Sequence, residues 1–196
     1  CPACAEFNLR KRTELADLTG RVALLTGGRV KIGYQAGIKL LRAGASLVVT
    51  TRFPRDAARR YAKEPDASEW THRLHVYGID LRHTPSVELL CRHLVQTYAR
   101  LDALINNACQ TVRRPPDFYR HMLEREPGPL ATPPSAARRL LGGADGLRGA
   151  ELLEGPGELL ESAAAVTASS AEMSQAALLP DELLPHDGRF GCGPSR

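Results

Sequence analysis

Apolar residues between positions 13 and 124 follow two alternating patterns. Four short runs, rich in β-branched and aliphatic side chains, are typical of buried strands: Val22–Thr26, Ser46–Thr51, Leu74–Tyr77 and Ala103–Asn106. Three longer stretches with helical character lie between them: Ile32–Arg42, Arg55–Lys63 and Pro85–Ala99. Because strands that alternate with helices form right-handed crossovers, the pattern predicts an α/β domain with a parallel sheet.

The last of these helices has the clearest apolar face. Five side chains recur at the spacing of one helical face: Val87, Leu90, Leu94, Val95 and Tyr98. Ser86 or Thr84 is placed to cap its N-terminus. We expect this face to pack against the sheet.

Composition divides the chain into three parts. Residues 1–12 form a Cys-containing segment, and residues 13–124 have the composition of a packed domain. Residues 125–196 are rich in Pro, Gly, Ala and Leu, with a single aromatic side chain and no run of strand length. We expect this part to be a flexible, low-complexity tail that does not complete the sheet.

Charge and cysteine content limit the partners and the cellular compartment that we expect for this protein. The formal net charge of +4 does not call for a nucleic-acid partner, and no apolar run is long enough to span a membrane. Five cysteines without a secretion signal favour a reducing compartment, so we expect a cytoplasmic protein. Cys1 and Cys4 form half of a zinc-knuckle pattern, but two thiolates are too few to hold the metal, and we assign no metal site.

A glycine-containing loop connects the first strand to the first helix. Its sequence, TGGRVKIG, places Thr26, Gly27 and Gly28 at the strand end and Lys31, Ile32 and Gly33 at the helix start. N–H groups at a helix start bind pyrophosphate, and glycine allows the backbone to approach it closely. An ordinary strand-to-helix turn would leave the same pattern.

Three further groups of residues follow the other strands. Arg52 comes directly after the second strand with Arg55 close behind, Asp80 and Leu81 follow the third, and the Asn106-Asn107-Ala108 segment closes the fourth. A carboxylate about 20 residues past such a loop binds the ribose of NAD, whereas an arginine accommodates the 2′-phosphate of NADP. We therefore expect NADP rather than NAD.

With these landmarks the sequence resembles the short-chain dehydrogenases/reductases. Thr26, Gly27 and Gly33 match the Thr-Gly-x-x-x-Gly-x-Gly loop of that family, with Lys31 in place of the middle glycine. The resemblance implies a Rossmann-like, doubly wound parallel sheet, here incomplete with about four strands, that binds NAD(P). It also implies that Asp80 binds the adenine amino group. Asn107 and Ala108 would lie beside the cofactor, and Cys109 replaces the last glycine of the Asn-Asn-Ala-Gly motif.

The catalytic part of the family pattern is missing. None of the five tyrosines has a lysine four residues later, and the last lysine of the chain is Lys63. We assign no catalytic residue and expect an incomplete oxidoreductase portion, the product of a truncated or alternatively ended gene. We expect it to be inactive alone, acting on a small carbonyl or alcohol only in a longer form. The fourth strand would then be an open sheet edge, available for self-association.

Two other functions fit parts of the sequence. A non-catalytic nucleotide-sensing or partner-binding module would keep the Rossmann-like fold without the chemistry. The other is a Cys-rich fragment associated with nucleic acid. A Tyr-x-x-x-Lys pair in a longer reading frame would favour the enzyme.

Overall fold

A computed structural model describes residues 1–109, 116–124, 126 and 171. Four parallel strands form one sheet in the order β3-β2-β1-β4. Their bounds are β1 Val22–Thr26, β2 Ser46–Thr51, β3 Leu74–Gly78 and β4 Ala103–Asn106. The predicted Rossmann-like parallel sheet is confirmed, and every strand lies where the apolar runs predict it, with Gly78 added to β3.

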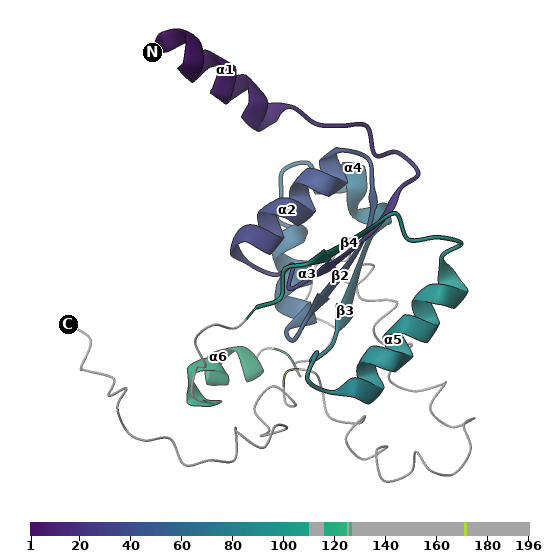
Figure 1. Cartoon of the computed structure of the whole chain (residues 1–196). Helices are drawn as coiled ribbons and strands as arrows, with labels where there is room; N and C mark the ends of the chain where they lie inside the picture. The colour runs from purple at the N-terminus through teal and green to yellow at the C-terminus, as the bar shows by residue number, and fades with distance from the viewer. Residues whose placement is uncertain (110–115, 125, 127–170, 172–196) are drawn as a thin grey trace, which may run out of the picture.

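Helices cover both faces of the sheet (Figure 1). The first face carries α2 (Lys31–Arg42), α3 (Pro54–Tyr61), α4 (Ala67–Trp70) and the 3-10 turn η1 (Thr71–Arg73), whereas α5 (Thr84–Thr97) covers the other. Leu47 and Val49 of β2 belong to the core beneath the first group, and Val48 belongs to the core beneath α5. Because neighbouring residues of a strand point to opposite faces, a sheet covered on both sides needs a continuous apolar run.

Two details of α5 differ from prediction. Leu90 is buried, and Val87, Leu94 and Tyr98 pack around it as expected, but Val95 is 80% exposed and lies off the apolar face. The N-cap is His83, whose ring nitrogen Nδ1 accepts the backbone N–H of Ser86 at 3.4 Å. The prediction of a Ser86 or Thr84 cap is wrong because the turn after β3 starts the helix at Thr84.

Further short elements were not predicted. The N-terminal helix α1 (Pro2–Thr13) buries no residue and extends away from the domain (Figure 1). The 3-10 turn η2 (Pro116–Tyr119) and helix α6 (Arg120–Leu123) follow β4. The tail predicted for 125–196 lies outside the described residues except for Glu126 and Ala171, which are both buried. No helix in the described part of the chain has the length and apolarity to cross a membrane.

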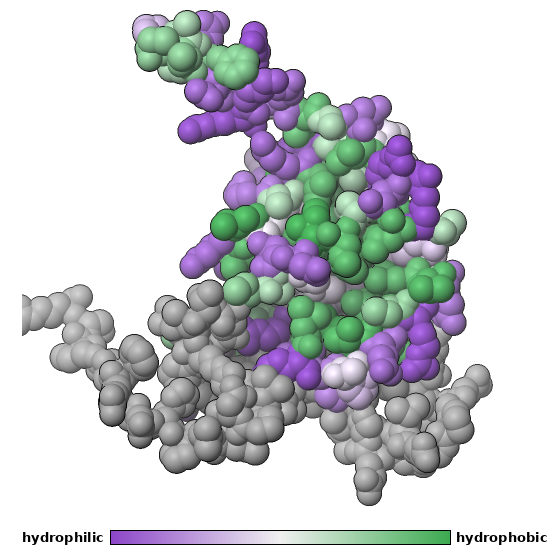
Figure 2. Space-filling model, viewed as in Figure 1, coloured by the Kyte–Doolittle hydropathy of each residue, from purple (hydrophilic) through white to green (hydrophobic). Residues whose placement is uncertain are grey.

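Strand β4 lies at one edge of the sheet. Among the described residues it pairs only with β1, and Leu104 is 56% exposed. Figure 2 shows apolar side chains gathered across the middle of the side of the molecule that faces the viewer, between α2 and α5. An exposed apolar edge is where a further strand or another chain can pair.

Candidate nucleotide-binding site

The carboxyl ends of the four strands meet at one edge of the sheet. Thr26 of β1 is in register with Thr50 of β2 and with Asn106 of β4, and Thr51 is in register with Gly78 of β3. The loop after β1, Arg52, Asp80 and Asn107 therefore all leave the sheet at the same end. This is the end at which open α/β sheets bind ligands.

Glycines of the loop permit close packing against the end of β4 and the core. Gly27 has a φ of 70°, and a Cβ there would lie 2.9 Å from the Cα of Ala108. A Cβ on Gly28 would lie 2.7 Å from Cγ1 of Val49, and one on Gly33 would collide with the side chain of Asn107 and the carbonyl of Gly27. The loop thus has no room for side chains at these positions.

Lys31 has a left-handed backbone conformation. Its φ is 54°, and it is the only non-glycine residue with a positive φ in the described part of the chain. Left-handed conformations suit glycine because the Cβ of other L-residues crowds the following carbonyl. The turn has therefore kept the backbone shape that suits glycine at the position where Lys31 stands.

The first turn of α2 provides an anion-binding end. Its N-cap is Val30, whose side chain makes no capping hydrogen bond, and the first turn contains no acidic residue. Unpaired N–H groups and the helix dipole favour a negative group at such an end. The residues present therefore fit the pyrophosphate of a dinucleotide, which Lys31, Ile32 and Gly33 would hold through their backbone.

The Asn107-Ala108 segment is bonded to the end of β1. The Thr26 hydroxyl oxygen accepts the backbone N–H groups of Asn107 and Ala108, each at 3.0 Å. The Asn107 side-chain amide donates to the carbonyls of Thr26 at 3.2 Å and Gly27 at 3.1 Å. Asn107 thus anchors the loop to the end of β4, next to the positions expected to hold the cofactor.

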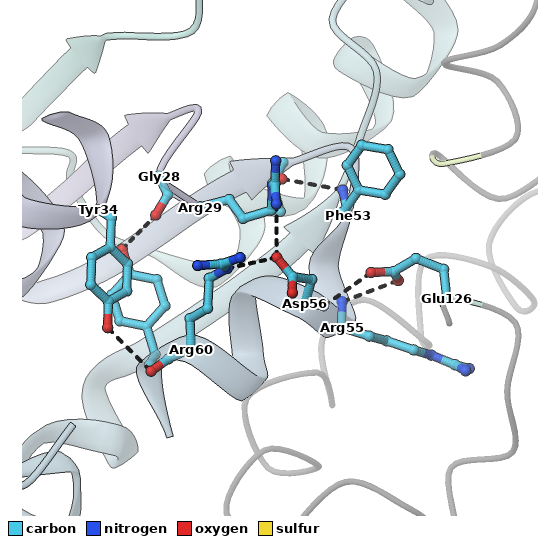
Figure 3. Close-up of polar contacts among 10 residues, drawn as sticks. Gly28, Arg29, Tyr34, Phe53, Arg55, Asp56, Arg60 and Glu126 are labelled. Carbon is cyan, nitrogen blue, oxygen red and sulfur yellow. Dashed lines mark hydrogen bonds and ion pairs between the residues drawn. The ribbon is translucent and has the colours of Figure 1, made fainter. Parts of the chain in front are cut away.

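A cationic corner lies at the end of β2. The guanidinium of Arg29 lies 5.3 Å from the ring centroid of Phe53, and that of Arg52 lies 5.9 Å from it. Arg29 is held by Asp56 through an ion pair of 2.8 Å (Figure 3). Burial raises the pKa of Asp56, but hydrogen bonds from Arg60 and Arg29 outweigh burial, and the net pKa is lowered. Sequence reasoning missed Arg29, although its place inside the glycine loop was the signal.

Glu126, which follows the predicted domain in the sequence, contacts the start of α3. Its carboxylate accepts the backbone N–H groups of Arg55 at 3.2 Å and Asp56 at 3.0 Å, and the residue is 6% exposed. Burial raises the pKa of Glu126, and the two backbone hydrogen bonds oppose that rise. Figure 3 shows the Arg55 side chain extending away from this carboxylate and from Asp56. The sequence places Glu126 in the expected tail and offered no signal for this contact.

Asp80 has a partner that the sequence did not indicate. It is 2% exposed, and its carboxylate accepts the backbone N–H of Arg82 at 3.0 Å and the Arg82 guanidinium at 2.8 Å. Ile32 is 79% exposed beside the site, and Leu81 is 44% exposed. The adenine contact expected of Asp80 stays a prediction, and that contact would share the carboxylate with Arg82.

Tyr61 has a structural role beside the loop. The Tyr61 hydroxyl donates to the carbonyl of Gly28 at 2.8 Å, and Gly37 leaves the space that this hydroxyl fills. Burial raises the pKa of Tyr61, which keeps the phenol protonated. Tyr61 therefore positions the loop. In the described part of the chain no three His, Cys, Asp or Glu side chains gather as a metal site, and the absence of a metal site in the whole chain stays a prediction.

Comparisons with known proteins address the domain as a whole. A family model described as short chain dehydrogenase matches residues 21–124. An uncharacterized protein of Acanthamoeba polyphaga mimivirus is 40% identical over 117 residues, which cover 57% of this chain and 25% of that protein. The 3beta-hydroxysteroid dehydrogenase 2 of Eggerthella lenta is 31% identical over 91 residues, which cover 46% of this chain and 34% of that enzyme. The chain thus spans about a quarter to a third of the length of these relatives.

Solved structures resemble the chain more distantly. A metagenomic short-chain oxidoreductase in complex with NADP is 23% identical, with a TM-score of 0.44, and the match covers 67% of this chain and 57% of that one. The RhlG/NADP active-site complex of Pseudomonas aeruginosa is 24% identical, with a TM-score of 0.41, over 67% of this chain and 49% of that one.

Proposed function

Because this chain belongs to the short-chain dehydrogenase family, we propose that it is the NADP(H)-binding portion of an oxidoreductase. The observation that carries the choice of NADP(H) is the cationic corner formed by Arg29 and Arg52 around Phe53 at the end of β2. An arginine at this place accommodates a 2′-phosphate, whereas a carboxylate would favour the free ribose hydroxyls of NAD.

Each part of the site has a task in this proposal. The first turn of α2 binds the pyrophosphate, Arg52 and Arg29 bind the 2′-phosphate, and Asp80 binds the adenine amino group. Asn107 and Ala108 line the cofactor beside the loop. A bound nicotinamide would supply or accept the hydride, with a small carbonyl or alcohol as substrate in a longer form of the protein.

Calorimetric titration of the 196-residue chain with NADPH and NADH tests the proposal. We expect NADPH to bind more tightly. The substitution Arg52→Gln should weaken NADPH binding by about tenfold or more, because a charge-assisted hydrogen bond contributes roughly 1.5–3 kcal/mol. The same substitution should leave NADH binding unchanged. Arg12→Gln, in the exposed helix α1, is the matched control and should alter neither. Equal affinities, or tighter binding of NADH, would refute the choice of NADP(H).

A non-catalytic nucleotide-binding module is the second candidate. The observation in its favour is that no tyrosine of this chain is followed by lysine four residues later. Cofactor binding with a Tyr-x-x-x-Lys pair in a longer reading frame would favour the enzyme. Cofactor binding without turnover in every form of the protein would favour the module.

A further inference from the structure

We infer that Glu126 is an internal competitor for the 2′-phosphate of the cofactor, occupying the anion-binding start of α3 that lies beside the cationic corner. This inference rests on the proposed function, since the 2′-phosphate belongs to the cofactor proposed above. It assigns Glu126 a role in cofactor selection, because the carboxylate competes with the 2′-phosphate of NADP(H), which NAD(H) lacks.

The start of α3 has two backbone donors to offer, and Glu126 takes both. Pro54 opens the helix and has no N–H. The N–H of Ala57 is already bonded to the carbonyl of Phe53 at 3.1 Å. The N–H groups of Arg55 and Asp56 remain, here called the α3 anion site, and both donate to the Glu126 carboxylate. A second anion can use this site only if Glu126 leaves.

Charge around the α3 anion site suits a phosphate better than a carboxylate. Arg55 and Arg59 both belong to α3, and the carboxylate of Asp56 in the same helix is paired with Arg29 and Arg60. Arg52, at the end of β2, lies two residues before the helix start. A phosphate carries up to two negative charges and more acceptor oxygens than a carboxylate, so the same donors and cations should favour it.

Short elements bring Glu126 to this position. Its backbone N–H bonds to the carbonyls of Met122 and Leu123 at the end of α6, a helix that buries no residue. The ring of Tyr119, just before α6, lies 5.4 Å from that of Phe53. Because α6 buries no residue, it can move away at modest cost in free energy, with the contacts of Tyr119 to Phe53 and Arg52 lost. Displacement of Glu126 therefore does not require unfolding of the domain.

The first test compares nucleotides that differ in the 2′-phosphate. Calorimetry with 2′,5′-ADP and with 5′-ADP would be run on the 196-residue chain, on Glu126→Gln and on Glu124→Gln, whose exposed carboxylate lies in the same segment. We expect Glu126→Gln to bind 2′,5′-ADP about tenfold more tightly than the unaltered chain, with 5′-ADP unchanged. Glu124→Gln should match the unaltered chain. No gain for 2′,5′-ADP, or an equal gain for both nucleotides, would overturn the inference.

A second arm separates this inference from the proposed function. If no variant binds either nucleotide, the proposed function fails. Binding of inorganic phosphate then tests the α3 anion site by itself. Phosphate should raise the melting temperature of Glu126→Gln more than that of the unaltered chain at equal ionic strength. Equal shifts in the two proteins would refute competition at this site.

Hydrogen–deuterium exchange on the unaltered chain covers the case in which Glu126→Gln does not fold. Saturation with 2′,5′-ADP should accelerate exchange of the amides of residues 117–124 and of Glu126, whereas saturation with 5′-ADP should not. Unchanged or slower exchange in this segment under saturation with 2′,5′-ADP would contradict displacement of Glu126.

Discussion

Lys31 is the residue at which the loop departs most from its family pattern. It has a φ of 54° at the first position of α2. The left-handed region costs a non-glycine residue roughly 1–2 kcal/mol. Glycine would remove this strain, but it loses more conformational entropy on folding, which offsets part of the gain in stability. We therefore predict that Lys31→Gly is more stable than Lys31→Ala by about 1 kcal/mol. Both variants lose the charge, so urea unfolding of the pair isolates the backbone effect, and equal stabilities would show that the backbone at position 31 is not strained.

The packing of α5 against β3 provides a prediction about pH. His75 of β3 is half-buried with its ring centroid 6.3 Å from that of Tyr98, and burial, aided by the nearby His93, lowers the pKa of His75. Because the pKa of this histidine is lower in the folded state, the unfolded state takes up the proton at a higher pH than the folded state does. Stability should therefore fall as the pH drops below the ordinary histidine pKa of about 6.5.

Replacing His75→Phe should remove part of that loss. Between about pH 7.5 and 5.5 the free energy of unfolding should fall less in the variant than in the unaltered chain. The difference between the two falls should be at most about 1 kcal/mol after solvent screening. His72→Gln, at an exposed position in η1, is the matched control and should keep the original pH dependence. Identical pH dependence in His75→Phe and the unaltered chain would rule out a contribution from His75.

For the molecule as a whole, we predict binding without turnover. The last lysine of the given sequence is Lys63, and none of its five tyrosines is followed by lysine four residues later. Tyr61, which lies next to the loop, is bonded to Gly28 and has a raised pKa. Purified chain should oxidise no NADPH in the presence of a broad panel of aldehydes and ketones, beyond the rate of a heat-denatured control. A rate above that control that depends on the carbonyl compound would contradict the prediction.

Local signals in the sequence were enough to predict the sheet and to assign the candidate site residues to one end of it. The four apolar runs match β1 to β4 because strands covered on both faces must be apolar throughout their length. Gly27, Arg52, Asp80 and Asn107 could be assigned to one edge because parallel strands bring their carboxyl ends together. Helix α1 escaped notice because it buries no side chain and so has no apolar stripe to detect.

Contacts between distant parts of the chain depended on the tertiary structure. Val95 is exposed because α5 packs on the sheet through Val87, Leu90, Leu94 and Tyr98, and the cap at His83 depended on the turn that follows Asp80. Arg29 became part of the cationic corner only when the loop folded against Phe53. Glu126 is 70 residues from Asp56 along the chain, yet it bonds the backbone of Asp56 at 3.0 Å. Periodicity and spacing report the surroundings of neighbouring residues, whereas this contact exists only because the segment after α6 places a carboxylate against two N–H groups at the start of α3.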